Sequence, residues 1–439
     1  MSTRRKRSAA QVPVETVDIT VDALGAQGDG IAQAAILAHT HTLYIPGALP
    51  GEKVRVRTVA RRGDGFAAEL LDILEPSPER AQPPCPHYAH CGGCALQHLN
   101  RAGYADWKRE RVVRALAQRG FADAPVHDPV LIGEGTRRRV AFTAVRRGGN
   151  VAFGFNARAS HDVVAIDNCP LLAADLNALI GPLSALAGDT LSDGQRARIH
   201  VTACENGADV LIEAGTSPEL SIREALAAFV RDTHTVRLAW QEEGLSPEPI
   251  AQEAAPLVYL SGVPVELPSG AFLQASVEGE HAIRDGVLDA VGADATRVAD
   301  LFCGLGSFTL PLAQRAVVEA VDSVEAPLRA LERAAGRADL GGRVSVQVRD
   351  LTRQPLETGE LNKFDAVVFD PPRAGAAEQA QYLAYADVPS VVGVSCNPAT
   401  FARDARILAD VKYELVSVQP IDQFTYSSHV ELVAHFVRR

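Results

Sequence analysis

VADLFCGLGSF, at residues 298–308, is the stretch that decides the fold of this 439-residue chain. Its apolar start, Val298–Phe302, is typical of a buried strand, and Phe308–Arg315 is typical of a helix. Between them, Gly304 and Gly306 allow the backbone to approach a ligand closely. The pattern predicts a strand, a glycine-rich turn and a helix, with a ligand site at the turn.

Strands and helices alternate around this turn from about Ser261 to the end of the chain. Helical stretches such as Ala326–Ala335 lie between strands, and the expected strands are Val298–Phe302, Val317–Val321, Val344–Val348, Ala366–Phe369 and Val391–Val394. This alternation is typical of a parallel sheet with crossover helices. We therefore expect residues 261–439 to form an α/β Rossmann-like domain.

Three polar residues follow the carboxyl ends of these strands, where α/β sheets hold their ligands and their chemistry. Asp322 lies about 20 residues beyond the turn, the usual place of an acid that holds ribose hydroxyls. Asp370 closes the fourth strand in FDPPR, and Cys396 closes the fifth in SCNPAT. A cysteine is often a buried, inert thiol. Because Asn397 and Pro398 follow the strand directly, we expect this thiol at a loop that faces the ligand.

The charge of the chain is unevenly distributed. The total of −11 by itself disfavours a nucleic-acid partner. Residues 1–170, however, hold 22 Lys/Arg against 17 Asp/Glu, whereas residues 171–439 hold 21 against 37. The basic excess lies in runs at Arg4–Arg7, Lys53–Arg62, Arg137–Arg139 and Arg146–Arg147. A solvated surface explains any single run equally well, but four runs in one half favour an RNA or DNA face.

The N-terminal half has a different organisation from the C-terminal third. We expect residues 1–13 to be a flexible basic arm, and short alternating strands from Val14 to Leu74 predict a small OB-like barrel. Such a barrel suits single-stranded nucleic acid. A proline-rich linker follows, and residues 75–260 mix strands with helices, which indicates a central α+β domain. The chain shows neither a signal peptide nor a membrane-spanning apolar stretch, so we expect it in the cytoplasm.

Four of the seven cysteines lie within residues 1–170, at Cys85, Cys91, Cys94 and Cys169. In a reducing compartment, clustered cysteines more often bind metal than form disulfides. Thiolates hold both [4Fe–4S] clusters and structural zinc. The spacing alone does not decide between these two groups.

Five motifs together resemble the RNA uracil-5-methyltransferases over essentially the whole chain beyond the first dozen residues. They are Phe272–Gln274, Asp300–Phe308, Asp370–Arg373, Ser395–Thr400 and His429–Glu431. The cysteine spacing is similar to the [4Fe–4S] ligands of the ribosomal-RNA branch of that family. The resemblance implies a TRAM/OB-like barrel at residues 14–74, a central α+β domain with the cluster at 75–260, and a class I methyltransferase domain at 261–439. Residues 95–124 are then expected to pack with the catalytic domain.

The resemblance also implies a covalent mechanism. Uracil C5 is a weak nucleophile, and addition of a thiolate at C6 makes C5 enolate-like, so that it can attack a methyl group. The family's S-C-N-P motif gives the nucleophile as Cys396. A carboxylate must later remove the C5 proton, and the family's H-x-E motif gives this general base as Glu431.

S-adenosylmethionine is the cofactor that the resemblance implies. The matching positions are Gln274, Phe302, Gly304, Gly306, Ser307, Asp322, Asp350 and Asp370. The acid at Asp322 is usually Glu in the family, so Glu325 is an alternative ribose ligand, and Ser307 stands where Asn is common. An ordinary turn acid is an equal explanation for Asp350.

RNA is the implied substrate, with 23S-type ribosomal RNA favoured because the cluster and barrel are often absent from members acting on transfer RNA. A transfer-RNA uracil-5-methyltransferase is the alternative, and a radical methylthiotransferase or a non-catalytic RNA-binding protein is more distant. We expect the barrel and Arg137–Arg139 to contact RNA, and the chain to be a monomer. Cys204 and Cys303 have no expected role.

Overall fold

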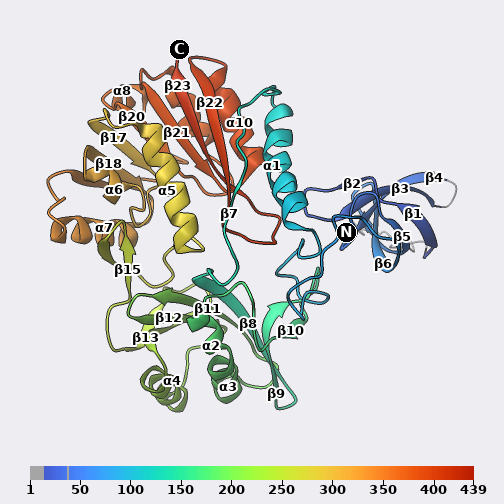
Figure 1. Cartoon of the computed structure of the whole chain (residues 1–439). Helices are drawn as coiled ribbons and strands as arrows, with labels where there is room; N and C mark the ends of the chain where they lie inside the picture. The colour runs from blue at the N-terminus through green and yellow to red at the C-terminus, as the bar shows by residue number, and fades with distance from the viewer. Residues whose placement is uncertain (1–13, 37–38) are drawn as a thin grey trace, which may run out of the picture. The chain divides into compact units, whose positions relative to one another are not determined.

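The computed structural model describes residues 14–36 and 39–439 of the chain (Figure 1). The basic arm expected at residues 1–13 lies outside these ranges. The chain divides into two compact units. Unit 1 comprises the described residues up to Tyr88 together with Cys94–Trp107 and Tyr426–Ser428. Unit 2 comprises Ala89–Gly93, Lys108–Thr425 and His429–Arg439.

Unit 1 is built on a six-stranded sheet with the order β1-β5-β6-β4-β3-β2. In β5, Val54 and Val56 are buried, whereas Lys53, Arg55 and Arg57 face solvent. This period of two is typical of a sheet with one face on a core. The strands are β1 (Thr16–Thr20), β2 (Ala23–Leu24), β3 (Gly30–Ile36), β4 (His39–Ile45), β5 (Lys53–Arg62) and β6 (Gly65–Glu75).

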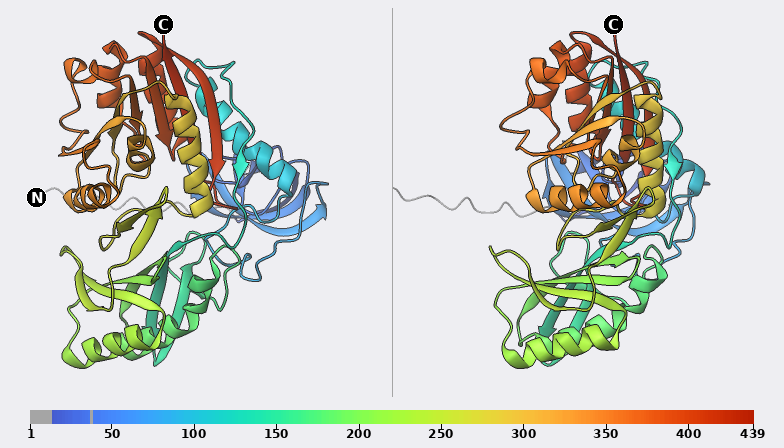
Figure 2. Two further views of the ribbon diagram at one scale, coloured as in Figure 1. Left: turned by 60° about the vertical axis from the view of Figure 1, so that its left-hand side comes forward. Right: turned by 90° about the vertical axis from the view of Figure 1, so that its left-hand side faces the viewer.

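Unit 2 contains a central seven-stranded sheet with the order β10-β9-β8-β11-β12-β13-β14. Its helices α2 (Ala174–Ala178), α3 (Ile180–Thr190) and α4 (Leu220–Asp232) bury Leu176, Leu183 and Phe229 against the sheet (Figure 2). Its strands are β8 (Arg139–Arg147), β9 (Asn150–Asn156), β10 (Val163–Ala165), β11 (Arg196–Cys204), β12 (Gly207–Ala214), β13 (Thr235–Glu242) and β14 (Glu248–Gln252). A hairpin of β15 (Leu257–Leu260) and β16 (Val263–Glu266) follows.

The C-terminal part of unit 2 is an eight-stranded sheet with the order β19-β18-β17-β20-β21-β23-β22-β7. Its first five strands in that order pair in parallel, whereas β23 is antiparallel to both β21 and β22. The strands are β7 (Val130–Leu131), β17 (Arg297–Leu301), β18 (Val317–Asp322), β19 (Val344–Val348), β20 (Ala366–Phe369), β21 (Ser390–Ser395), β22 (Tyr413–Asp422) and β23 (Glu431–Arg438).

Helices cover both faces of this sheet (Figures 1 and 2). Val368 of β20 packs into a core with α5 (Val277–Val291) and α6 (Thr309–Ala313). The preceding residue, Val367, packs on the opposite face with α1 (Arg101–Ala117), α8 (Thr358–Leu361), α9 (Ala377–Tyr385) and α10 (Pro398–Ala409). Strands that are buried on both faces read as continuous apolar runs, which is why these segments are recognisable in the sequence.

The structure confirms the expected α/β arrangement of the C-terminal third. All five expected parallel strands are present, each to within one residue at either end. The antiparallel strands β22 and β23, which complete the sheet, are not among the expected elements. Within the described residues, the structure has no helix with the length and apolar character needed to cross a membrane.

Candidate active site

The glycine-rich turn after β17 has backbone geometry that depends on its residues. Gly306 has φ 88°, and a Cβ atom added there would lie 2.4 Å from Leu331 Cδ1 of α7 (Glu325–Arg337). Gly304 has φ 53°, and Phe302 has φ 61° although it carries a side chain. A left-handed non-glycine residue is strained, and such strain is concentrated at functional sites. The half-buried Ser307 belongs to the same turn.

Asp322 fastens the end of β18 to this turn. Its carboxylate accepts hydrogen bonds from the backbone N–H of Gly304 at 3.0 Å and of Val324 at 2.9 Å. The alternative acid, Glu325, is exposed and pairs with Arg329 at 3.3 Å. Of the two carboxylates, therefore, Asp322 is the one that contacts the glycine turn.

Asp300, the first acid of the glycine motif, is fully buried. Thr309 Oγ1 donates to its Oδ2 at 2.5 Å, whereas Oδ1 has no hydrogen-bond partner within the described part of the chain. Burial raises the pKa of Asp300 to about 7, and the negative charges of Asp370 and Asp322 act in the same direction. Its place four residues before the first glycine of the turn is the sequence signal for this buried acid.

Cys396 and Glu431 lie at adjacent positions of neighbouring strands. Ser395 of β21 is opposite Leu432 of β23 in antiparallel register, so the next positions outward are Cys396 and Glu431. Asn397 then caps α10, because its Oδ1 accepts from the backbone N–H of Ala399 at 3.1 Å. The half-buried thiol thus lies between the carboxyl end of a strand and the amino end of a helix.

The electrostatics of the thiol site favour its neutral form. Burial raises the pKa of Cys396 to about 11, the negative charges of Glu431 and Asp370 contribute in the same direction, and Arg373 opposes them. The pKa of Asp370 is raised to about 8, first by burial and then by Glu431. Burial also raises the pKa of Glu431, which is 4% exposed, to about 7. The site therefore joins a potential nucleophile to a carboxyl group that exchanges protons near neutral pH.

Gln274 is linked to Glu431 by Gln423, a residue that lies outside the sequence motifs. Gln423, directly after β22, donates from Nε2 to Gln274 Oε1 at 2.6 Å and to Glu431 Oε1 at 3.3 Å. Lys108 of α1 is also buried and pairs with the buried Asp422 at 2.7 Å. Buried polar residues such as Gln423 and Lys108, beside apolar strand and helix positions, are a weak sequence signal, because the sequence does not show which of them are buried.

The three arginines at 137–139 do not lie on one common surface. Arg138 is 7% exposed, donates from Nε to the Gln274 backbone oxygen at 3.0 Å, and pairs with the buried Glu280. A guanidinium held in this way is part of the interior, so the expectation that Arg138 contacts RNA is wrong. Arg137 and Arg139 instead line a hollow of about 450 Å³, together with Phe272.

Asp350 is held by its own turn after β19. Its Oδ1 accepts from the backbone N–H of Thr352 at 3.0 Å and from Thr352 Oγ1 at 2.6 Å. These bonds and the nearby Arg353 lower its pKa. The contacts are those of the turn acid that the sequence left as an alternative.

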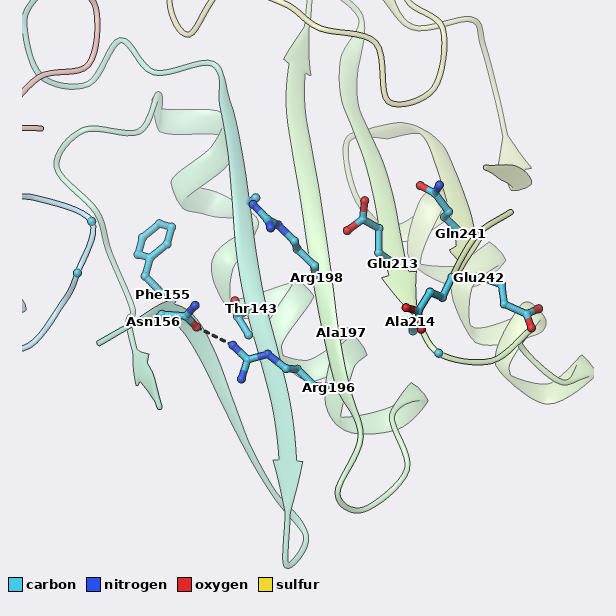
Figure 3. Close-up of a pocket in the computed structure, with 16 residues that line it drawn as sticks. Thr143, Phe155, Asn156, Arg196, Ala197, Arg198, Glu213, Ala214, Gln241 and Glu242 are labelled. Carbon is cyan, nitrogen blue, oxygen red and sulfur yellow. Dashed lines mark hydrogen bonds between the residues drawn. The ribbon is translucent and has the colours of Figure 1, made fainter. Parts of the chain in front are cut away.

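A hollow of about 760 Å³ lies on the central sheet (Figure 3), and neither Cys396 nor Glu431 lines it. Arg198, Glu213 and Gln241 line it, and Arg196 is bound to Asn156 Oδ1 at 2.7 Å. Acidic and basic side chains are mixed there. Its size alone therefore does not identify a site.

The basic run on β5 is largely paired with acids of neighbouring strands. Arg55 pairs with Asp18 at 2.8 Å, Arg62 pairs with Asp29 at 2.6 Å, and Lys53 and Arg57 pair with Glu75 and Glu69. Exposed pairs of this kind contribute little to stability. They do reduce the free positive charge that the sequence count suggests for this sheet.

Of the four expected cluster ligands, Cys85 and Cys94 belong to unit 1, and Cys91 and Cys169 belong to unit 2. Within residues 14–36 and 39–439, the structure brings no three His, Cys, Asp or Glu side chains together as a metal-binding group. The thiols are the donor type that iron–sulfur clusters use, so the residues agree with the expected cluster in chemistry alone.

Comparisons with known proteins place these residues in a family. A family model described as tRNA (Uracil-5-)-methyltransferase matches residues 344–439, which include Asp370, Cys396 and Glu431. A solved structure, the Pyrococcus abyssi tRNA (uracil-54, C5)-methyltransferase with S-adenosyl-L-homocysteine, is similar with a TM-score of 0.74 over 96% of this chain and 100% of that chain. At 22% identity, this likeness shows the fold alone.

Two sequence relatives extend the match to the full length. An RNA methyltransferase of Caulobacter vibrioides, described as uncharacterized, is 42% identical over 96% of this chain and 100% of that protein. The 23S rRNA (uracil(1939)-C(5))-methyltransferase RlmD of Aeromonas salmonicida is 33% identical over 96% of each chain. The chain therefore belongs to the RNA uracil-5-methyltransferase family.

Proposed function

We propose that the enzyme transfers a methyl group from S-adenosylmethionine to C5 of a uridine in RNA, through a covalent bond between Cys396 and uracil C6. The observation that carries this proposal is the register of β21 and β23, which places Cys396 beside Glu431. The glycine turn of β17 lies at the carboxyl ends of the same sheet, where α/β folds bind their ligands.

Cys396 acts first. The thiol loses its proton to solvent water, the sulfur bonds to C6, and the electrons of the C5–C6 double bond move toward C5 and the O4 carbonyl. Because burial raises the pKa of this thiol to about 11, little thiolate is present at neutral pH in the free enzyme. Arg373, which lowers this pKa, is placed to favour the thiolate form.

Glu431 acts after methyl transfer. S-adenosylmethionine would supply an electrophilic methyl group to C5, and breakage of its methyl–sulfur bond would leave S-adenosylhomocysteine. Glu431 then removes the C5 proton, the C5–C6 double bond forms again, and the Cys396 thiolate leaves. A general base is most effective when its pKa is near the working pH, and burial raises the pKa of Glu431 to about 7.

The cofactor is proposed to lie at the glycine turn. Asp322 would hold the ribose, since it contacts Gly304, and Asp350 would lie near the adenine. The other proposed cofactor residues are Gln274, Phe302, Gly304, Gly306, Ser307 and Asp370. Their support is the family pattern together with the turn geometry described above.

We also propose the finer features of the ribosomal-RNA branch. The six-stranded sheet of unit 1 would serve as a TRAM-type RNA-binding barrel, and Arg137 and Arg139 would contact RNA. Cys85, Cys91, Cys94 and Cys169 would hold a [4Fe–4S] cluster. The preferred substrate is 23S-type ribosomal RNA, because a relative named for that activity is 33% identical over 96% of the chain. Transfer RNA is the alternative.

The test is methyl transfer from labelled S-adenosylmethionine to transcribed 23S ribosomal RNA and, separately, to transcribed transfer RNA. We expect 5-methyluridine in the ribosomal RNA by nucleoside mass spectrometry, and a denaturation-resistant complex with RNA that contains 5-fluorouridine. Cys396→Ala should abolish both, because no other group supplies the bond to C6. The matched control is Cys204→Ala, which removes a thiol whose pKa burial raises to about 12.

Glu431→Gln separates the two chemical steps. This variant should form the covalent complex with unmodified uridine RNA but release it at least about 100-fold more slowly, a typical loss for a missing general base. Turnover at the wild-type rate by Cys396→Ala or by Glu431→Gln would contradict the assigned role. Methylation confined to transfer RNA would replace the preferred substrate with the alternative.

A further inference from the structure

Gln423 is buried between Gln274 and Glu431, and its contacts fix the orientation of its side-chain amide. It is 4% exposed, and its Oε1 accepts from the backbone N–H of Ala275 at 2.9 Å. A backbone N–H can only donate, so the side-chain oxygen must face Ala275 and the amide NH₂ must face the opposite way. The orientation of this amide is therefore set by the backbone.

The NH₂ group has two hydrogens, and two acceptors lie in front of it. One is Gln274 Oε1 at 2.6 Å and the other is Glu431 Oε1 at 3.3 Å. Since the amide donates, this Glu431 oxygen must accept, which favours the carboxylate over the protonated acid. The hydrogen bond thus acts against the effect of burial on Glu431.

The backbone beside Gln423 is held as well. Lys108 Nζ donates to Asp422, the preceding residue, at 2.7 Å and also to the backbone oxygen of His429. The same ammonium therefore contacts Asp422, directly before Gln423, and His429, two residues before Glu431. Gly279 at the start of α5 leaves the space for Gln423, because a Cβ added there would lie 2.6 Å from Gln423 Cβ.

We infer that Gln423 is a positioning residue for the reaction: it orients Glu431, keeps it ionised for proton removal, and links it to Gln274 of the cofactor site. This inference rests on the proposed function, because it requires Glu431 to be the base. The titratable groups that face Glu431 are Asp370 and Cys396, and both can carry negative charge. Lys108 and Asp422 neutralise each other. Gln423 is accordingly the hydrogen-bond donor that favours the ionised base.

The test is the pH profile of kcat for Gln423→Met, a change of similar volume that removes both donors. Loss of the hydrogen bond should move the acidic limb of the profile upward by about one pH unit, which lowers kcat about tenfold below pH 7 and much less at pH 9. Covalent trapping by 5-fluorouridine RNA should show no such loss below pH 7, because fluorine at C5 blocks the step that needs Glu431. The same change at Gln419, on β22, is the matched control; its amide donates to the Asp128 backbone oxygen at 2.7 Å, and its profile should stay that of the wild type.

The outcomes separate this inference from the proposed function. A wild-type enzyme that methylates neither RNA removes the proposed function. An active wild type whose acidic limb is unchanged in Gln423→Met, or a variant that loses trapping and turnover equally at every pH, overturns the positioning role. If Gln423→Met does not fold, Gln423→Glu keeps the shape and the acceptor for Ala275, and its added negative charge should move the limb upward further.

Discussion

At the scale of single residues, the site is a group of carboxyl groups that the fold keeps partly neutral. Burial is the first cause of the raised pKa of Asp300, Asp370 and Glu431. Burying a carboxyl group in this way lowers the stability of the fold, and such groups are concentrated where chemistry or a ligand needs them. Asp300 is fully buried, and one of its oxygens has no hydrogen-bond partner among the residues that the structure describes.

Asp300 should make the protein less stable as the pH rises. Its pKa is raised in the folded state to about 7, whereas in the unfolded chain it is near the ordinary value of about 3.9. Between these values the unfolded state has lost the proton and the folded state still holds it, so stability falls with increasing pH. Asp300→Asn should remove this penalty and raise the thermal midpoint relative to wild type at pH 8 but not at pH 4.

Asp365→Asn is the control, because the pH dependence of stability that Asp365 causes has the opposite sign. Asp365 accepts from the backbone N–H of Thr296 at 2.8 Å and of Arg297 at 2.9 Å, and its pKa is lowered by Thr296 first. Its stabilisation is therefore present above the unfolded pKa and lost in acid, so this variant should melt lower than wild type at pH 8. Equal shifts in both variants at every pH would show that the carboxyl charges are irrelevant to stability.

At the scale of elements, the glycine turn depends on its contact with α7. The absence of a side chain at Gly306 allows Leu331 to pack directly on the turn, and the turn then lies against Asp322. The hairpin of β15 and β16 contributes Val258 and Val265 to the same core. The turn after β17 is thus the proposed cofactor loop, and α7, β18 and the hairpin of β15 and β16 hold it in shape.

Gly306→Ala should lower stability by about 1–3 kcal/mol, because it combines a left-handed φ with a clash against Leu331. It should also weaken binding of S-adenosylmethionine, measured by titration calorimetry. Gly336→Ala is the matched control in α7, where an added Cβ meets nothing within 4 Å, and it should stabilise by about 0.5–1 kcal/mol. Wild-type melting and binding in Gly306→Ala would show that the turn tolerates a side chain.

At the scale of the whole molecule, the count of basic residues in the N-terminal part overstates the positive charge that is not already in ion pairs. The N-terminal half is basic and the remainder strongly acidic. On β5, however, Arg55 and Arg62 are already paired with acids. RNA affinity would then depend on fewer free cations than the count suggests.

The proposed [4Fe–4S] cluster gives a prediction for the whole purified protein. Protein purified without oxygen should contain about four iron atoms per chain and show broad visible absorption, since the four cysteines match the ligand set of a [4Fe–4S] centre. Cys91→Ser should lose the iron, whereas Cys204→Ser should retain it. Stoichiometric zinc without iron in the anaerobic protein would favour a structural zinc site instead.

The sequence by itself determined the parallel strands and the glycine turn, because buried strands and glycine-rich motifs are local patterns. The resemblance to the family singled out Cys396 and Glu431, whose roles stay predictions. The sequence did not determine that β23 inserts antiparallel beside β21, since strand pairing depends on contacts between distant segments. Only this register places Glu431 next to Cys396. Burial likewise belongs to the tertiary structure: it made Arg138 an internal residue, gave Gln423 its two acceptors, and raised the pKa of the carboxyl groups that the sequence could only list as acids.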